Sequence, residues 1–424
     1  MSIRLEKLLE VSVGSPIGQC RARAVTLGEG EPRAFLVAWC GDFDVDPYTE
    51  MFFFPTDTLK LAVITEEGEE LWRRDLGPGV VPGHWFCPVA AFDLDGDGAS
   101  ECWFVNNLTP EHPLGLGGYR LECLDARTGA TVGQWPWPEV KRGQSLSHLF
   151  RNFIVGGRAR GEPVLITAQG TYGDMHLQGW STGMVERWRH DIAADAPGAR
   201  GSHMTPVADI NEDGVDELMW GERCIELDRG AELWCADRDS YRGHSDVIWP
   251  FRNPDGPGWL IYTCREGDRD VSPRVVCYDA EGERVWGAVD AGHMDMGWVA
   301  NLGEGGRPVA MAIRIGHKTC GPDGRHHFDR DEFVFDAATG APVELPFGVY
   351  GTLPVDLDGD GVHELVYGIA GQDGRVIDRL GAELGCTGGP SALCGNLMPR
   401  PGEQILSYHE DGRLGVWGDA NAGG

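Results

Sequence analysis

Three acidic runs of equal length carry the kind of side chains that bind a hard cation. They read DLDGDGASE at 93–101, DINEDGVDE at 209–217 and DLDGDGVHE at 356–364. Each run has oxygen-bearing side chains at its positions 1, 3, 5 and 9 and a glycine at position 6, as in the loops of EF-hands. The spacing predicts up to three structural Ca²⁺ sites. The expected ligands are Asp93, Asp95, Asp97, Glu101, Asp209, Asn211, Asp213, Glu217, Asp356, Asp358, Asp360 and Glu364.

A second group of residues is suited to proton transfer and to binding anions. Histidines precede or begin apolar stretches in PGHWF, LSHLF, GSHMT, RGHSD and AGHMD. Imidazole has a pKa near 6.5, so it can act as an acid or a base at neutral pH. These histidines are His84, His148, His203, His244 and His293. Further polar side chains follow the next apolar stretches, namely Tyr172, Arg265, Glu266, His317 and Lys318.

The composition excludes several classes of partner. The 424 residues include 36 Lys and Arg against 66 Asp and Glu, a net charge of −30. Nucleic acids and anionic membranes are therefore not expected as partners. No apolar stretch approaches the roughly 18 residues of a membrane span. Charges interrupt the N-terminal segment, and the 12 cysteines form no Cys-x-x-Cys pair, so we expect a reduced, cytoplasmic protein.

Internal repeats predict the architecture. A strand–turn–strand pattern recurs every 40 to 65 residues, mostly followed by a third strand and a short aromatic-bearing one. Four short antiparallel strands per repeat are typical of a β-propeller. We expect one all-β domain over 1–424 with eight four-stranded blades, seven being the alternative. The last unit lacks an outer strand, which the N-terminal LEKLLEVSVG can supply to close the ring. The units begin near Cys20, His84, His148, His203, His244, His293, Tyr350 and Pro390.

This architecture separates the two groups of residues. In a propeller blade the first turn lies at one end of the strands, and the chain enters the blade at the other end. The acidic runs fall in first turns, and the five histidines fall at blade entries. We therefore expect the Ca²⁺ sites to be scaffold, and the chemistry to lie among the histidines, Tyr172, Arg265, His317 and Lys318. For the histidines, a purely structural role is the alternative.

From about residue 151 to 290 the chain resembles the bacterial rhamnogalacturonan lyases, which are eight-bladed propellers containing calcium. The resemblance is carried by RARGEPVLITAQGTYGDMHLQGW, GSHMTPVADINEDGVDELMWGERCIEL and GHSDVIWPFRNPDGPGWLIYTCRE. The family has a His-Glu pair where this chain has Arg265 and Glu266. The resemblance implies a lyase that acts on an acidic, rhamnose-containing oligosaccharide or polysaccharide such as rhamnogalacturonan or rhamnosyl-glucuronate.

A uronate lyase removes the proton beside the carboxylate and expels the glycosidic oxygen from the neighbouring carbon. The carboxylate must be neutralised to stabilise the transition state. Arg265 and Lys318 are expected to do this, with His203 or His244 as base and Tyr172 as acid or base. His84, His148, His293 and His317 are expected to bind substrate. Calcium in place of Arg265 is a less favoured alternative, because no cluster of Asp stands out among the histidines.

Three other functions are compatible with the sequence. A related hydrolase would release terminal rhamnose and form no double bond. A non-catalytic, calcium-stabilised propeller would bind sugar or protein only. A quinone-dependent dehydrogenase would use turns such as DARTG and EGEELW, although these turns serve equally well to pack outer strands. Trp85 and Trp298 could stack on sugars, but core packing is the favoured role for both.

Overall fold

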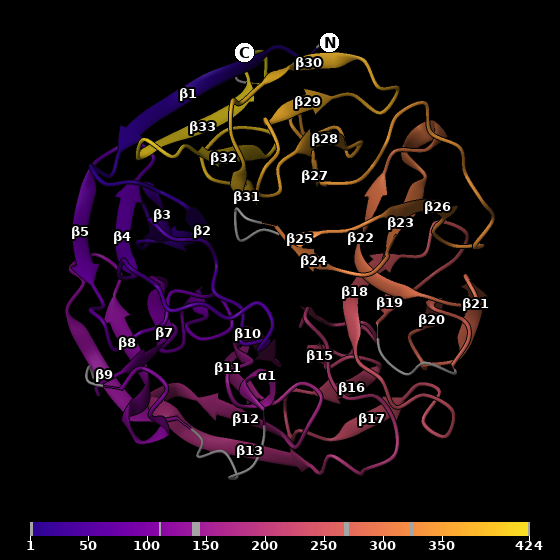
Figure 1. Ribbon diagram of the computed structural model, residues 1–424, viewed down its shortest axis with the longest axis horizontal. Coiled ribbons are helices and arrows are strands. Elements are labelled where there is room, and N and C mark those ends of the chain that lie inside the picture. Colours follow the sequence, from indigo (N-terminus) through magenta and orange to yellow (C-terminus); the bar gives the residue numbers. More distant parts are fainter. Residues whose placement is uncertain (1–2, 110–111, 138–144, 267–270, 322–325, 423–424) are drawn as a thin grey trace. The chain divides into compact units, whose positions relative to one another are not determined.

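The computed structural model describes residues 3–109, 112–137, 145–266, 271–321 and 326–422. The chain forms two compact units, Met1–Leu146 with Gly351–Gly424, and Ser147–Tyr350. Each unit contains four antiparallel sheets of three or four strands, and the second unit also has a two-stranded hairpin (Figure 1). Helix is limited, in the described ranges, to α1 (Leu146–Leu149) and the 3₁₀ turns Leu116–Gly118, Thr182–Met184 and Glu304–Gly306. None of these helices is long and apolar enough to cross a membrane.

The first unit is built from four sheets of four strands each. Three of them are formed by consecutive strands, and the fourth includes the first strand of the chain. The sheets are β2 (Gln19–Thr26), β3 (Arg33–Cys40), β4 (Lys60–Thr65), β5 (Glu70–Asp75); β6 (Val89–Phe92), β7 (Glu101–Asn107), β8 (Tyr119–Asp125), β9 (Thr131–Pro136); β27 (Thr352–Val355), β28 (Glu364–Tyr367), β29 (Arg375–Ile377), β30 (Glu383–Cys386); and β31 (Ser391–Gly395), β32 (Gln404–Tyr408), β33 (Arg413–Asp419), β1 (Leu5–Ser12).

The second unit has three four-stranded sheets and one of three strands. In that last sheet, an isolated bridge between Phe335 and Pro342 stands where a fourth strand would pair. The sheets are β10 (Asn152–Ala159), β11 (Glu162–Gln169), β12 (Met175–Ser181), β13 (Val185–Ile192); β14 (Val207–Ala208), β15 (Glu217–Met219), β16 (Arg223–Glu226), β17 (Glu232–Cys235); β18 (Ser245–Arg252), β19 (Trp259–Arg265), β20 (Val275–Asp279), β21 (Arg284–Ala288); and β22 (His293–Asn301), β23 (Pro308–Ile315), β26 (Arg330–Asp336), with the hairpin β24 (Thr319–Cys320) and β25 (His326–His327) beside them.

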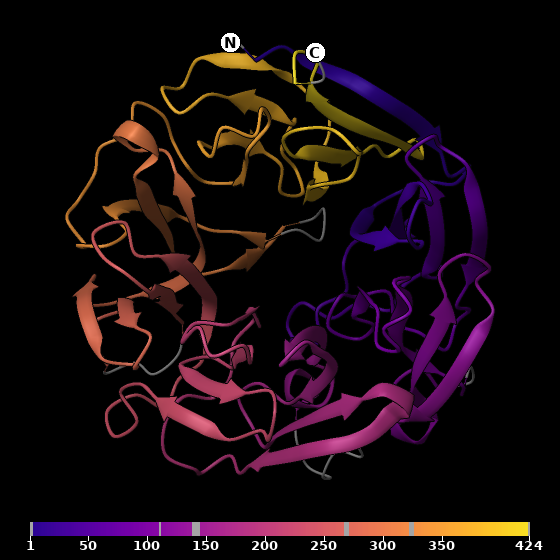
Figure 2. The ribbon, with the colours of Figure 1, turned by 180° about the vertical axis from the view of Figure 1, so that it is seen from behind.

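The eight sheets make the chain an eight-bladed β-propeller, which confirms the predicted fold class. The expected role of the N-terminal strand is also confirmed, because β1 pairs antiparallel with β33 as the outer strand of the last blade. Figures 1 and 2 show the indigo β1 alongside the yellow β33. The three acidic runs connect the first two strands of their blades, as predicted. That all 424 residues form a single domain stays a prediction.

Within each unit, neighbouring blades are joined by a repeated tryptophan contact. An outer-strand indole Nε1–H donates to a backbone carbonyl in the last turn of the next blade. The four pairs are Trp72 to Ala126 (2.7 Å), Trp188 to Leu227 (2.8 Å), Trp234 to Ala280 (2.8 Å) and Trp286 to Ala337 (2.9 Å). The DARTG turn thus packs against an outer strand, the simpler of the two roles that the sequence allowed.

The glycine in each such turn lies against the indole. At Gly282, φ is +81°, and an added Cβ would stand 2.7 Å from Cδ2 of Trp234. We expect Gly282→Ala to lower the free energy of unfolding by about 1–3 kcal/mol, because it adds both a strained φ and a clash. Denaturant unfolding measures this effect. Gly256→Ala is the matched control, since its Cβ would have ordinary contacts and no positive φ. Equal stability of the two variants would contradict the prediction.

Candidate active site and metal centre

The second unit brings four ionisable side chains together at the ends of its central strands. His244 and Asp246 flank Ser245 at the start of β18, and Glu266 directly follows β19. The backbone fixes these positions: Glu266 N donates to His244 O (3.1 Å) and His203 N donates to Ser245 O (3.0 Å). The acidic run at 209–217 follows β14 while His203 precedes it, so scaffold loop and centre lie at opposite ends of this strand, as predicted.

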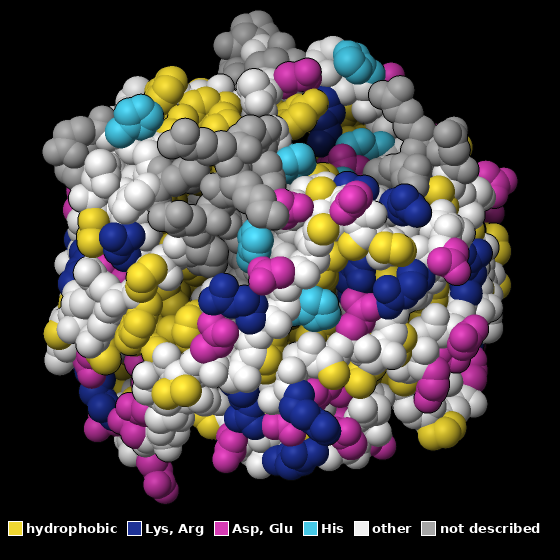
Figure 3. All heavy atoms as spheres, turned by 90° about the horizontal axis from the view of Figure 1, so that it is seen from below, with side chains coloured by type: hydrophobic (Ala, Val, Ile, Leu, Met, Phe, Trp, Pro, Cys, Tyr) yellow, Lys and Arg dark blue, Asp and Glu magenta, His cyan; other side chains and the backbone are white. Residues whose placement is uncertain are grey.

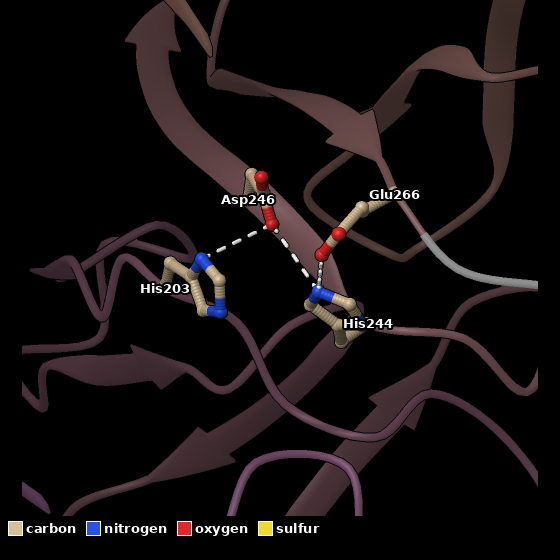
Figure 4. A group of neighbouring side chains, drawn as sticks. All are labelled: His203, His244, Asp246 and Glu266. Atoms are coloured by element: carbon tan, nitrogen blue, oxygen red, sulfur yellow. Dashed lines mark ion pairs between the residues drawn. The ribbon is translucent and has the colours of Figure 1, made fainter. Parts of the chain in front are cut away.

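The imidazoles and carboxylates of this centre point at one another (Figure 4). Asp246 Oδ1 lies 3.1 Å from Nδ1 of His203 and 3.3 Å from Nε2 of His244. The same Nε2 of His244 contacts Glu266 Oε2. His244 and Asp246 have side-chain exposures of 6% and 5%, while His203 and Glu266 are 20% exposed. The centre is therefore largely enclosed and reached through His203 and Glu266.

These four residues fit a divalent cation. Each offers one ligand atom, and the atoms all lie within 4.8 Å of one another. Three of the atoms, Nε2 of His244, Oδ1 of Asp246 and Oε2 of Glu266, are buried and make no hydrogen bond despite their proximity. Buried polar atoms are nearly always hydrogen-bonded, so lone pairs that converge without a donor indicate a position for a cation. Imidazole together with carboxylate suits Zn²⁺, Mn²⁺ or Co²⁺ better than an all-oxygen loop does.

Without a cation, protons balance the charge of the centre. Burial opposes protonation of His244, but Asp246 and Glu266 outweigh it and raise the pKa of its imidazole to about 8. Burial, and then repulsion by Glu266, raises the pKa of Asp246 to about 8. Burial favours the neutral form of Glu266, yet the adjacent imidazoles of His244 and His293 hold its pKa well below the usual range. Glu266 thus stays ionised between two imidazoles.

The cation-free protein should lose stability as the pH rises from about 6.5 to 9. His244 has a pKa near 6.5 in an unfolded chain and about 8 here, so the folded state binds the extra proton. That stabilisation is complete below pH 6.5 and is lost as the pH passes 8; for His244 it is on the order of 2 kcal/mol. His293 has a pKa of about 9, so it also stabilises the folded state at low pH and loses this effect as the pH rises. The Tm of the protein, measured in the presence of a chelator, should fall as the pH rises through this range. A Tm that does not change with pH would contradict the raised pKa values of His244 and His293.

An aromatic group adjoins the centre. Tyr172 Oη lies 2.8 Å from Nε2 of His203, and its ring centroid is 4.1 Å from that of His244. Tyr172 has a φ of +80°, a strained conformation that folded proteins keep mainly at functional sites. His148, on α1, stands 5.9 Å from Tyr172 between ring centroids. Burial and the charges of Arg200 and Arg151 lower the pKa of His148, so its imidazole is neutral at neutral pH.

His293, Asp295 and Lys318 extend the centre on its other side. His293 Nε2 lies 2.7 Å from Glu266 Oε1 and 3.1 Å from Asp295 Oδ1. The ammonium of Lys318 lies 3.1 Å from the same Asp295 oxygen. Burial disfavours its charge, but Asp295, Glu266 and Asp246 outweigh burial and raise its pKa. Lys318 is 30% exposed, so a stable cationic group faces solvent beside the centre.

The structure corrects the expected role of Arg265. Its side chain is fully buried, and Nε and Nη2 bind Glu222 at 2.9 and 3.2 Å. The guanidinium also binds Asp237 and stacks on Tyr241 at 4.1 Å. Burial alone would lower the pKa of Arg265, but its partners, Glu222 above all, outweigh burial and hold the pKa above the usual range. Arg265 cannot bind a substrate carboxylate, because its donors point into the core; it supports the end of β19, which Glu266 directly follows.

The remaining predicted residues are placed as follows. His84 lies in the first unit, contacts Asp44 and is 42% exposed. His317 is exposed next to Lys318. Trp85 and Trp298 are buried, at 7% and 2% exposure, which agrees with core packing and leaves them no face for a sugar.

The acidic runs have the geometry of cation loops. In the first, Asp93 accepts the N–H groups of Gly96 (2.7 Å) and Gly98 (3.0 Å), and Glu101 accepts that of Leu94 (2.9 Å). Burial and the neighbouring aspartates raise the pKa of Glu101 to about 7, a repulsion that a cation would relieve. Burial likewise raises the pKa of Glu217 to about 7 and of Glu364 to about 8. Ligand atoms lie within 4.8 Å of one another in Asp93, Asp95 and Glu101, and in Asp356, Asp358 and Asp360.

Sequence reasoning missed two aspartates of the centre. Asp246 and Asp295 each follow a blade-entry histidine by two residues, in RGHSD and AGHMD. A His-x-Asp pair at a strand start points both side chains to one face, since side chains alternate along a strand. This repeated spacing was the available signal. Glu266 was expected in the same region beside Arg265, but no role was assigned to it, and Glu222 had no signal because its partners come from other strands.

Comparisons with known proteins show which proteins this chain resembles. The family model "Rhamnogalacturonan lyase family 11, C-terminal domain" matches residues 156–307. Rhamnogalacturonan exolyase YesX of Bacillus subtilis (strain 168) is 26% identical over 434 residues, covering 90% of this chain and 67% of that protein. Rhamnogalacturonan endolyase YesW of the same organism is 22% identical over 276 residues, covering 56% and 42%. The chain thus spans about two thirds of the first relative and less than half of the second.

The crystal structure of exotype rhamnogalacturonan lyase YesX has the same fold. It superimposes with a TM-score of 0.77 at 21% identity, over 97% of this chain and 76% of that one. The stretch matched by the family model contains Tyr172, His203, His244, Asp246 and Glu266. The chain is therefore a β-propeller that is similar to rhamnogalacturonan lyases, and its candidate centre lies within the residues that match their family model.

Proposed function

We propose that the protein cleaves a rhamnogalacturonan-type glycan by β-elimination at its uronic acid. The observation that carries the proposal is the enclosed centre of His203, His244, Asp246 and Glu266, whose buried atoms converge without a donor. A cation held there would neutralise the uronate carboxylate and stabilise the enolate-like transition state. The relatives named above are lyases of rhamnogalacturonan, one an exolyase and one an endolyase, which supports the substrate class.

The side chains around the centre divide the remaining tasks. Lys318, held by Asp295, supplies a second positive charge for the carboxylate. His148 is neutral and can take the proton beside the carboxylate; we assign it this role instead of His203 or His244, whose nitrogens face carboxylates or Tyr172. Tyr172 Oη, oriented by His203, can give its proton to the leaving glycosidic oxygen. The carbon–oxygen bond breaks as the carbon–carbon double bond forms. His148 keeps the proton taken from carbon, and the leaving oxygen becomes a hydroxyl with the proton from Tyr172.

The acidic runs are proposed to hold Ca²⁺ as scaffold. Their donors are all oxygen, which suits Ca²⁺, and they connect strands at the opposite blade ends from the histidines. Cytoplasmic location remains part of the proposal, and it would favour short imported oligosaccharides as substrates.

Ultraviolet absorbance tests the function directly. Wild-type protein with rhamnogalacturonan should produce the absorption band of an unsaturated uronate, and removal of divalent cations should abolish it. Tyr172→Phe should lower kcat by about 10²-fold with little change in KM, since proton donation acts in the transition state. Free rhamnose without the band would establish a hydrolase instead. Tight binding without any product would leave a sugar-binding propeller.

A further inference from the structure

We propose that Arg200 is a positioning residue of the candidate active site, which fixes the backbone of Tyr172 and acts on His148 through its positive charge. The inference rests on the proposed function, because Tyr172 and His148 are the side chains that would transfer protons there. It deepens that function by naming the residue that controls both of them. Arg200 lies between β13 and β14, in the segment that leads to His203.

Arg200 binds both polar backbone groups of Tyr172. The N–H of Tyr172 donates to Arg200 O (3.3 Å), and Nη1 of Arg200 donates to Tyr172 O (3.1 Å). Tyr172 needs such support because its φ is +80°, a conformation that a residue with a Cβ keeps only where its surroundings enforce it. Arg200 N also donates to Gly243 O (2.8 Å), next to His244. One residue therefore joins the turn that carries Tyr172 to the segment that carries His244.

The charge of Arg200 is not neutralised by a carboxylate in the described ranges of the chain. Its Nη1 binds a carbonyl, and its Nε is buried and makes no hydrogen bond with the described residues. Arg223 and Arg265, by contrast, each pair with a glutamate. A cation in a partly buried position without a counter-charge acts strongly on neighbouring titratable groups. Arg200 is therefore placed to control the protonation of a neighbour.

His148 is the titratable group on which this charge acts. Its pKa is lowered by burial above all, then by the charge of Arg200 and then by that of Arg151, while Asp174 opposes them. Arg151 is buried, and its guanidinium lies 5.4 Å from the ring centroid of Tyr172, the titratable ring next to His148. Because a base must be neutral to accept a proton, Arg200 supports the active form of His148 as well as the position of Tyr172.

The test separates the hydrogen bond of Arg200 from its charge. Arg200→Gln removes the charge and shortens the side chain, whereas Arg200→Lys keeps the charge but loses the planar guanidinium. Initial rates on rhamnogalacturonan are measured against pH. Arg200→Gln should lower kcat by about 10- to 100-fold with little change in KM, because a small displacement of a reacting group has an effect of this size. The acidic limb of its kcat/KM profile should move to higher pH, since His148 then protonates more readily. Arg200→Lys should lower kcat and leave the limb in place.

A surface arginine provides the matched control. Lys and Arg side chains on the face seen in Figure 3 lie among Asp and Glu side chains. Arg229, in the turn between β16 and β17, has such surroundings: it is 78% exposed and lies 3.9 Å from both Glu226 and Asp228. Arg229→Gln makes the same change of charge as Arg200→Gln. It should keep the kcat and the pH profile of the wild type.

A nuclear magnetic resonance titration of labelled imidazoles tests Arg200 without any activity. The His148 signal, identified by its absence from His148→Gln, should titrate at a higher pH in Arg200→Gln than in wild type, and at the wild-type pH in Arg200→Lys. An unchanged pKa of His148 in Arg200→Gln would overturn the proposal. So would a wild-type kcat in that variant, or a lower kcat with an unmoved acidic limb, which is the result of a purely structural role. A raised pKa of His148 in a protein that cleaves no rhamnogalacturonan would refute only the proposed function.

Discussion

Glu266→Gln should abolish most lyase activity, lowering kcat/KM by about a thousandfold, while the protein stays folded. The carboxylate of Glu266 contacts His244 through one oxygen and His293 through the other, at 2.7 Å. Glutamine has nearly the same shape, but its NH₂ group places a donor where a lone pair is needed. It also removes one negative charge from the centre. Loss of one electrostatic contact to the developing charge typically costs 10²–10³ in rate, and loss of the cation would add to it.

Initial rates on rhamnogalacturonan, followed by ultraviolet absorbance, measure this effect. Glu281→Gln is the matched control, because Glu281 lies exposed in the turn between β20 and β21 and makes the same change of charge. The control should keep full activity. Added Mn²⁺ or Co²⁺ should restore little of the lyase activity of Glu266→Gln. Activity within tenfold of wild type would show that Glu266 does not hold the reacting group or its cation.

Arg265→Met should lower the free energy of unfolding by about 3–5 kcal/mol, the usual cost of removing one partner of a buried ion pair. Arg265 and Glu222 have side-chain exposures of 0% and 1%. Without the guanidinium, the Glu222 carboxylate remains buried with no compensating charge, whereas Asp237 keeps its contact with Arg284. The double variant Arg265→Met/Glu222→Gln should recover part of the loss, because it removes the stranded charge. The coupling between the two sites is then read from a double-mutant cycle.

Denaturant unfolding in saturating Ca²⁺ compares these variants with Arg284→Met. Arg284 also contacts Asp237 but is 35% exposed, so its replacement should cost less than about 1 kcal/mol. If Arg265→Met lowered the free energy of unfolding by no more than Arg284→Met does, the result would show that water reaches the ion pairs of Arg265. We expect the activity of Arg265→Met to fall together with its stability, since Arg265 ends the strand that positions Glu266.

The fold could be predicted because its information is local and repeated. Each blade restates the same strand and turn pattern, and the acidic runs fall at the same step of that pattern in three blades. Blade entries could be recognised by their histidines, which is why His203, His244 and Tyr172 were correctly expected to share one region. Repetition of this kind constrains topology more strongly than any single strand does.

The composition of the centre could not be predicted in the same way. Arg265 and Glu266 are adjacent in sequence, yet alternation along β19 sends one side chain into the core and lets the other reach the centre. Arg265 was expected to be accessible because nothing local reveals Glu222 and Asp237, which lie 43 and 28 residues away. Which of two neighbouring charges is buried depends on partners from other strands, and the sequence does not display those partners.

The pairing of β1 with β33 determines when this protein can finish folding. Leu5 pairs with Asp419, so a ribosome must synthesise some four hundred further residues before β1 meets its partner. At about 5–20 residues per second, this delay lasts tens of seconds, during which β1 and the nascent blades present open edges. A chain terminated early would lack β33 and leave β1 unpaired, a form that edge-to-edge aggregation or proteases would remove. The blade that contains β1 can therefore form only after β33 has been synthesised.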